Sequence, residues 1–232
     1  MMKATAALSL LTVLLFCTPV SAALFFDDFE DGNADGWAAS ASGTGTTGVV
    51  DNNGSLRAYA STSYRGARSL SRTFGYVDSD ILSFEMQVAA NSGIELTIGG
   101  ARTRHASGGA KITFLNVFNG AVADPVYLTH RTDGSMPPAY AGVFLGETLN
   151  SFSAPMQNYA ALAGLGSASG VAKISLEFFA NSGGGGGGTG SSVAAASVWF
   201  DNVSIATVPI PASVWLVTPV LGWIGWHRRN QL

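Results

Sequence analysis

The stretch Ile81-Leu82-Ser83-Phe84-Glu85-Met86-Gln87-Val88 decides the fold class of this chain. Leu82, Phe84, Met86 and Val88 alternate with polar residues, which is the period of a β-strand with one buried face. The same alternation recurs at residues 94–98 and 172–178. Further β-prone runs, separated by Gly, Asn, Asp and Ser clusters, lie at 24–29, 55–59, 69–74, 111–118, 126–130, 140–145 and 197–205. About ten short strands predict an all-β protein with a single jelly-roll-like β-sandwich.

The segments between these strands add little helix. Residues 154–165 are compatible with one short helix, and no long helical period lies between the two ends of the chain. Six consecutive glycines at 183–188 predict a flexible loop between the last two strands. A phosphate-binding P-loop would need a following Lys and a helix, and the sequence has neither there.

The composition excludes several classes of function. The net charge is -3, whereas nucleic-acid binding requires a basic patch, so no nucleic-acid partner is expected. The single cysteine, Cys17, lies in the N-terminal apolar run, so the predicted domain contains no disulfide or thiolate site. The three histidines have none of the spacings of a zinc motif.

Residues 1–22 are interpreted as a secretory signal peptide. Lys3 provides the positive start, residues 6–16 the short apolar core, and Val20-Ser21-Ala22 the small-residue cleavage site. The sequence therefore predicts a β-sandwich ectodomain at residues 23–207, after the signal helix.

The last 25 residues, 208–232, form a separate module. Val208-Pro209-Ile210-Pro211-Ala212 leads into an apolar run that ends at Trp226 and is followed by Arg228-Arg229. At 1.5 Å per residue, the run 210–226 spans about 25 Å, which is the short end of a transmembrane helix. Terminal arginines favour the cytoplasmic side of a membrane. The alternative is a buried C-terminal strand or helix of the main domain.

This tail resembles the PEP-CTERM class of sorting tails, in its Val-Pro-x-Pro-Ala variant, although Ile210 stands where the name-giving motif has Glu. The resemblance implies recognition by an exosortase in a Gram-negative bacterium that makes exopolysaccharide. It also implies export across the inner membrane, a transient membrane anchor, and a final place at the cell surface or in the extracellular matrix. The implied sorting and processing residues are Val208, Pro209, Pro211, Ala212, Arg228 and Arg229.

The first and last segments of the predicted β domain show a second resemblance. The opening segment 25–32 and the closing segment 199–205 both place acidic residues beside aromatic ones, and they resemble concanavalin A-like and carbohydrate-binding jelly rolls. In such modules a structural calcium ion often ties the first strand to the last, which implies Asp28, Glu30 and Asp201 as candidate Ca²⁺ ligands. Carboxylate oxygens suit this hard cation. The alternative is a polar turn that caps its own backbone.

The same region also contains part of a second calcium pattern. Residues 31–36 match the first half of an EF-hand loop, but Ser42 stands where the bidentate Glu is required. A true EF-hand is therefore not expected.

The residues show no catalytic constellation, so we expect a non-enzymatic protein that binds exopolysaccharide. The alternative is a polysaccharide-acting glycosidase or lyase on the same fold. Exposed aromatic residues would serve sugar binding, and the basic stretch 102–105 would suit an acidic polysaccharide. The aromatic candidates are Trp37, Tyr59, Tyr64, Tyr76, Tyr127, Tyr140 and Tyr159. For each of them taken singly, packing in the core or at its rim is the favoured alternative.

Overall fold

The computed structural model describes residues 23–51, 54–63, 66–97, 100–131, 142–144, 148–166, 170–183, 189–190 and 194–207. The chain divides into a compact unit at Leu24–Ile205 and a second unit formed by its two ends, and only the first is considered below. The predicted signal peptide, the tail 208–232 with its sorting residues, and most of the glycine run lie outside the described residues. Within the described ranges, no helix is long and apolar enough to cross a membrane.

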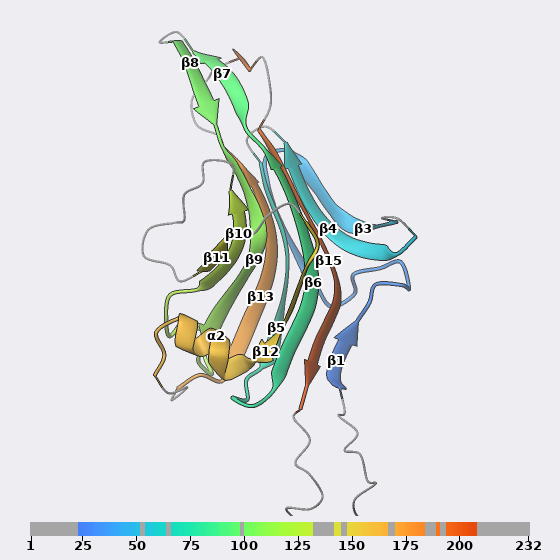
Figure 1. The fold of residues 1–232 in the computed structure, drawn as a ribbon, viewed down its shortest axis with the longest axis vertical. Coiled ribbons are helices and arrows are strands. Elements are labelled where there is room, and N and C mark those ends of the chain that lie inside the picture. Colours follow the sequence, from blue (N-terminus) through green and yellow to red (C-terminus); the bar gives the residue numbers. More distant parts are fainter. Residues whose placement is uncertain are drawn as a thin grey trace, which may run out of the picture. The chain divides into compact units, whose positions relative to one another are not determined.

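Two six-stranded sheets form the unit (Figure 1). Sheet A has the order β12-β6-β15-β4-β3, with β1 paired to β15. Its strands are β1 (Ala23–Asp27), β3 (Gly45–Asp51), β4 (Leu56–Ser63), β6 (Ile81–Asn91), β12 (Asn150–Pro155) and β15 (Ala195–Ala206).

Sheet B has the order β11-β10-β9-β13-β5-β2. The pairs from β10 to β2 are antiparallel, whereas β10 and β11 run parallel. Its strands are β2 (Ala38–Ser42), β5 (Ala67–Gly75), β9 (Ala106–Leu115), β10 (Val126–Arg131), β11 (Gly142–Phe144) and β13 (Lys173–Ser182).

A small third sheet extends beyond the two large ones. It consists of β14 (Thr189–Gly190), β7 (Gly93–Thr97) and β8 (Gly100–Arg104). Because β7 follows β6 and β8 leads into β9, this hairpin prolongs a connection between sheets A and B (Figure 1).

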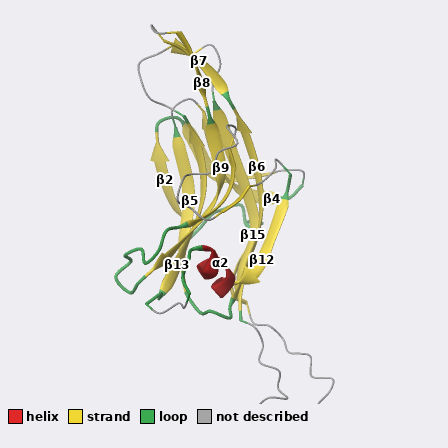
Figure 2. Ribbon diagram, turned by 60° about the vertical axis from the view of Figure 1, so that its left-hand side comes forward, coloured by secondary structure: helices red, strands yellow, loops and turns green. Residues whose placement is uncertain are grey.

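The core lies between the two large sheets, so the predicted β-sandwich is confirmed. In β6, Leu82, Phe84, Met86 and Val88 are buried, as the alternation predicts. From the other sheet, Phe178 stacks on Phe200 of β15 with ring centroids 3.8 Å apart. Each such buried side chain contributes about 1.5–3 kcal/mol to folding. The short helix expected within 154–165 is also present as α2 (Met156–Leu162), which lies at one end of the sheets and buries Met156, Tyr159 and Ala160 (Figure 2).

Several strands depart from the sequence-based prediction. The run 111–118 leaves the strand after Leu115, because the Asn116 side chain accepts hydrogen bonds from the amides of Phe118 and Gly120 and closes a turn. The first strand ends at Asp27, and Phe29 adopts a left-handed backbone with φ 56°. Strands β2, β3, β8, β12 and β14 were not expected from the sequence; they are short or poor in large apolar residues, and pairing with neighbours defines them.

Candidate functional site

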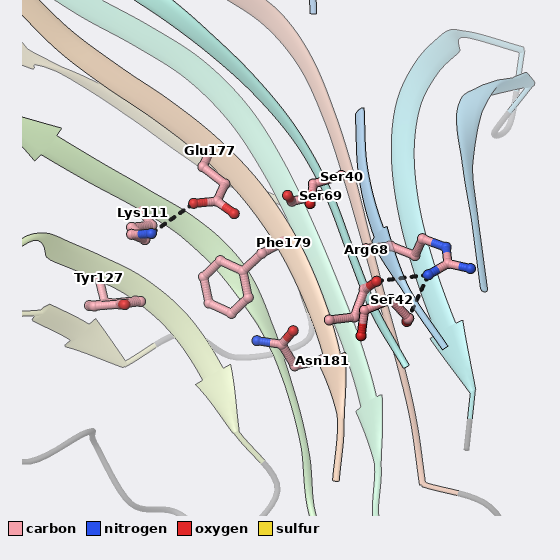
Figure 3. Close-up of a pocket in the computed structure, with 10 residues that line it drawn as sticks. Ser40, Ser42, Arg68, Ser69, Lys111, Tyr127, Glu177, Phe179 and Asn181 are labelled. Carbon is pink, nitrogen blue, oxygen red and sulfur yellow. Dashed lines mark hydrogen bonds and ion pairs between the residues drawn. The ribbon is translucent and has the colours of Figure 1, made fainter. Parts of the chain in front are cut away.

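The outer face of sheet B carries a pocket of about 180 Å³ (Figure 3). Antiparallel pairing aligns Ser40 of β2 with Ser69 of β5, Ser69 with Phe179 of β13, and Phe179 with Gly109 of β9. Alternation directs Leu70 and Phe178 into the core, so their neighbours Ser69 and Phe179 point to the opposite face. The pocket is thus built from side chains of five strands, β2, β5, β9, β10 and β13.

Two aromatic rings form one wall of the pocket. Tyr127 of β10 and Phe179 of β13 meet edge to face, with ring centroids 5.9 Å apart and an angle of 84° between the planes. Their strands are not neighbours, because β9 lies between them. Adjacent strands are about 4.8 Å apart, so the two rings must lean toward each other across β9. Gly109 of β9 has no side chain to keep them apart.

Glycine is required at position 109 for a second reason. Its φ is +154°, and a Cβ at this position would clash with the carbonyl oxygen of Leu128 in β10. The close approach of β9 and β10 beneath the aromatic pair therefore depends on this residue.

An ion pair lies beside the aromatic wall. Lys111 Nζ donates to Glu177 Oε2 at 2.9 Å, and the two residues are directly opposite each other in β9 and β13. Their side chains are 31% and 28% exposed, so both remain accessible to a ligand. Since the charges are opposite, the pair contributes no net charge to the pocket.

Neutral polar groups line the rest of the pocket. Ser40, Ser42, Ser69 and Asn181 offer hydroxyl and amide groups that both donate and accept hydrogen bonds. Arg68 fixes the rim, because its guanidinium donates to the carbonyl oxygens of Ser42, Gly43 and Ala67 at 2.7–2.9 Å. This holds the turn between β2 and β3 against β5.

Of the seven aromatic candidates from the sequence, the structure places Tyr127 in this pocket. Trp37 and Tyr159 are 8% and 6% exposed and belong to the core, and Tyr76 packs against it, so for these three the favoured alternative of core packing holds. Burial raises the pKa of Tyr159 to about 12. Tyr59 is half-buried in sheet A, and Tyr64 and Tyr140 lie outside the described residues.

The basic stretch 102–105 lies elsewhere. Arg102 and Arg104 belong to β8, in the small third sheet, and Arg104 is not among the described residues that line the pocket. Conversely, sequence reasoning missed Lys111, Phe179 and Asn181 as site residues. The alternation of 172–178, continued by two further positions, would have placed Phe179 and Asn181 on the same outward face as Glu177.

The predicted calcium ligands are brought together in part. Glu30 Oε1 and Asp201 Oδ2 lie 3.2 Å and 3.1 Å from the same hydroxyl, Ser55 Oγ. One hydroxyl proton can serve only one of the two carboxylates at a time. Arg57 Nε, 3.9 Å from Asp201, gives weak further compensation. Burial is the main cause that raises the pKa of Asp201, against the lowering effects of Asn202, Ser55 and Arg57.

The third predicted ligand, Asp28, is used differently. Its Oδ1 accepts a hydrogen bond from the amide of Glu30, which is the self-capping turn considered as the alternative. In the described part of the chain, no group of three or more His, Cys, Asp or Glu side chains is arranged to hold a metal ion. Two carboxylates and one hydroxyl are fewer oxygens than the six to eight that Ca²⁺ takes. The described side chains alone therefore do not complete a calcium site.

The partial EF-hand match at 31–36 is also a self-contained turn. Asp31 accepts hydrogen bonds from the backbone and side-chain nitrogens of Asn33, and Asn33 in turn accepts one from the amide of Asp35. These bonds satisfy the loop without a cation.

We compared the chain with known proteins. No family model matches it, and no curated protein matches it. Among solved structures, it is similar to a carbohydrate-binding module of the β-sandwich superfamily described for promiscuous specificity, with 12% identity over 81% of this chain and a TM-score of 0.43. The chain spans 63% of that protein's length.

Two further solved structures are similar over nearly their whole length. One is a family 11 carbohydrate-binding module from Clostridium thermocellum in complex with a β-1,3-1,4-mixed-linked tetrasaccharide, with 10% identity, coverage of 83% of this chain and 99% of that chain, and a TM-score of 0.41. The other is the CBM22-1 xylan-binding domain from Paenibacillus barcinonensis Xyn10C, with 12% identity, coverage of 84% and 99%, and a TM-score of 0.39. At these identities and TM-scores, we take the function from the residues of this chain.

Proposed function

We propose that this chain is an exported, non-enzymatic protein of the cell surface or extracellular matrix, whose β-sandwich binds polysaccharide on the outer face of sheet B. The observation that carries the proposal is the Tyr127–Phe179 pair flanked by Lys111–Glu177 and a set of neutral polar side chains. Sugar rings have apolar C–H faces and a rim of hydroxyl groups. A site with an aromatic wall and a few placed polar groups complements both.

The pocket is small compared with sites that enclose a whole ligand, so a carbohydrate chain would occupy it with only part of its length. A volume of about 180 Å³ is below the range of about 300–1,000 Å³ typical of enclosed sites for drug-sized ligands. We infer that the pocket takes one sugar unit, while adjacent units lie along the exposed face. The Lys111–Glu177 pair is internally neutral, and the Arg68 guanidinium at the rim adds one positive charge, so the pocket can take a neutral or an acidic polysaccharide.

The binding reading is favoured over glycoside hydrolysis. Most glycoside hydrolases use one pair of carboxyl groups, which flank the scissile glycosidic bond. Among the described residues that line the pocket, Glu177 is the one carboxylate, and Lys111 holds it. A polysaccharide-acting enzyme remains the alternative, and its signature would be the release of reducing ends.

The experiment that tests binding is a glycan array on the full-length chain, followed by affinity electrophoresis in gels that contain the polysaccharide bound best on the array. Retardation of the wild type, lost in Tyr127→Ala, would support the proposal. A reducing-sugar assay on the same polymer separates the two functions, since release of sugar would reject the binding-only reading.

Delivery to the surface is a further part of the proposal. The sequence of the tail supports it, through Val208-Pro209-Ile210-Pro211-Ala212, the apolar run 210–226 and the arginine pair 228–229. We propose that an exosortase processes this tail after transient anchoring in the inner membrane. Deleting residues 209–232 should move the protein into the soluble exported fraction. If the truncated and full-length forms stay in the same cell fraction, the tail is not a sorting signal.

A further inference from the structure

A second pocket, of about 350 Å³, lies between β1, β5 and the turn that precedes β6. It shares no lining residue with the pocket on sheet B. Its volume is within the range of about 300–1,000 Å³ found for small-molecule sites, at the lower end. It is therefore large enough for a small organic molecule.

The walls of this second pocket are mainly apolar. Phe74 and Ile205 are buried and form its inner side, and Phe25 is half-buried beside them. Leu24 and Val77 are 62% and 52% exposed and form its rim. Apolar surface of this kind gains free energy when a ligand covers it.

A buried acid lines the same pocket. Asp80 is only 3% exposed, and its carboxyl accepts no hydrogen bond from the residues that the structure describes. Its oxygens are not among the fully buried side-chain atoms that lack a partner, so the carboxyl reaches the pocket surface. The backbone holds the residue in place without using the carboxyl, because the Asp80 amide donates to the carbonyl oxygen of Val77 and the Asp80 carbonyl oxygen accepts from the amide of Met156. This carboxyl is therefore free to accept hydrogen bonds from a ligand in the pocket.

A cation with spare donors lines the pocket as well. The Arg72 guanidinium lies over the Phe25 ring at 4.2 Å, and its Nη1 donates to the carbonyl oxygen of Asp35 at 3.0 Å. A guanidinium carries five N–H donors, so donors remain for a ligand. Arg72 and Asp80 do not form an ion pair with each other. The pocket thus combines two opposite, separate charges with an apolar body.

We propose that this pocket binds a small zwitterion with an apolar side chain, such as a hydrophobic amino acid. The ligand's ammonium group pairs with the Asp80 carboxylate, and its carboxylate pairs with the Arg72 guanidinium. Its side chain packs against Phe25, Phe74 and Val77. A neutral sugar would leave both charges without a counterion, and an apolar molecule with one charge would leave one of them.

The test uses the full-length chain and three probes that share the isobutyl group of leucine. L-leucine carries both charges, 3-methylbutylamine only the ammonium, and 4-methylpentanoic acid only the carboxylate. Saturation-transfer NMR and calorimetric titration would measure their binding. Since a charge-assisted hydrogen bond is worth about 1.5–3 kcal/mol, we expect L-leucine to bind in the millimolar range and each analogue at least about tenfold more weakly.

Variants locate the site. Asp80→Asn keeps the shape of the side chain and should weaken L-leucine binding at least about tenfold, as should Arg72→Gln. Val117→Ala is the control, because Val117 is 64% exposed and lies outside the pocket. Arg72→Gln also removes a stacking contact, so a variant that fails to fold is set aside and Asp80→Asn decides. No L-leucine binding, equal binding of all three probes, or unchanged binding to Asp80→Asn would each overturn the proposal.

Discussion

Tyr127 and Phe179 meet edge to face across β9, although their strands lie on opposite sides of it, and their ring centroids are 5.9 Å apart. This contact makes one surface out of three strands, β10, β9 and β13. The surface is preformed, since the two rings already contact each other and Phe179 is only 7% exposed. A preformed site loses little conformational entropy when a ligand binds.

Truncating Tyr127 should remove polysaccharide binding with little effect on the fold. Tyr127 is half-buried on the outer face, so Tyr127→Ala removes the ring that a sugar would contact. We expect affinity to fall roughly tenfold or more, which corresponds to about 1.4 kcal/mol. Affinity electrophoresis measures the loss. Tyr59→Ala is the matched control, because Tyr59 is also half-buried but lies in β4 of sheet A; equal losses in both variants would contradict the assigned site.

Adding one methyl group at Gly109 should disturb both stability and binding. The new Cβ would clash with the backbone of Leu128 and push β9 away from β10. We expect Gly109→Ala to lower the free energy of unfolding by about 1–3 kcal/mol, measured by denaturant titration. Gly75→Ala is the control, since a Cβ there meets nothing within 4 Å, and it should change stability by less than about 1 kcal/mol. Similar effects of the two variants would show that the β9–β10 approach does not depend on Gly109.

Removing the charge of Asp80 should stabilise the protein at neutral pH. Burial raises the pKa of this carboxyl above its ordinary value of 3.8, so the folded state binds protons more tightly than the unfolded state. The wild type therefore loses stability as the pH rises from the unfolded-state pKa to the folded-state pKa, and the full loss is present above the latter.

Asp80→Asn lacks this titration, so its free energy of unfolding at pH 7 should exceed that of the wild type by on the order of 1 kcal/mol. The difference should shrink as the pH falls toward 4. Thermal or denaturant unfolding at several pH values measures it. A variant that is less stable than the wild type at pH 7 would mean that the carboxylate has a stabilising partner. A variant that is more stable but no longer binds L-leucine would show that the residue is kept for a ligand.

Calcium binding stays a prediction, and the geometry sharpens how to test it. Glu30 and Asp201 share one hydroxyl proton from Ser55, and a cation would relieve the remaining repulsion between their oxygens. We expect Ca²⁺ to raise the melting temperature, and Glu30→Gln and Asp201→Asn to abolish that rise. Asp28→Asn should keep it, since Asp28 Oδ1 is occupied by the amide of Glu30. No thermal shift with millimolar Ca²⁺ would exclude the site.

Some features of this protein follow from sequence alone because they depend on local periodicity. The alternation at 81–88 and 172–178 predicts which side chains are buried, and Leu82, Phe84, Leu176 and Phe178 are fully buried. Strands built from Ala, Ser, Gly and Thr, such as β2, have no apolar period to detect, and only hydrogen bonding to β5 defines them. For the aromatic residues Trp37, Tyr127 and Tyr159, residue type alone does not show which way the ring points, so the sequence left both core packing and sugar contact open for each.

The candidate sites are products of tertiary structure. Ser40, Lys111, Tyr127 and Glu177 come from distant parts of the chain, and the register of β2, β5, β13, β9 and β10 brings them to one face. Asp80 and Arg72 became a possible ligand site only when β1 and Ile205 of β15 closed an apolar pocket around them. The sequence determined which strands have a buried face, because that pattern depends on neighbouring residues. Which outward side chains meet depends on strand pairing between remote segments, and only the folded chain decided that.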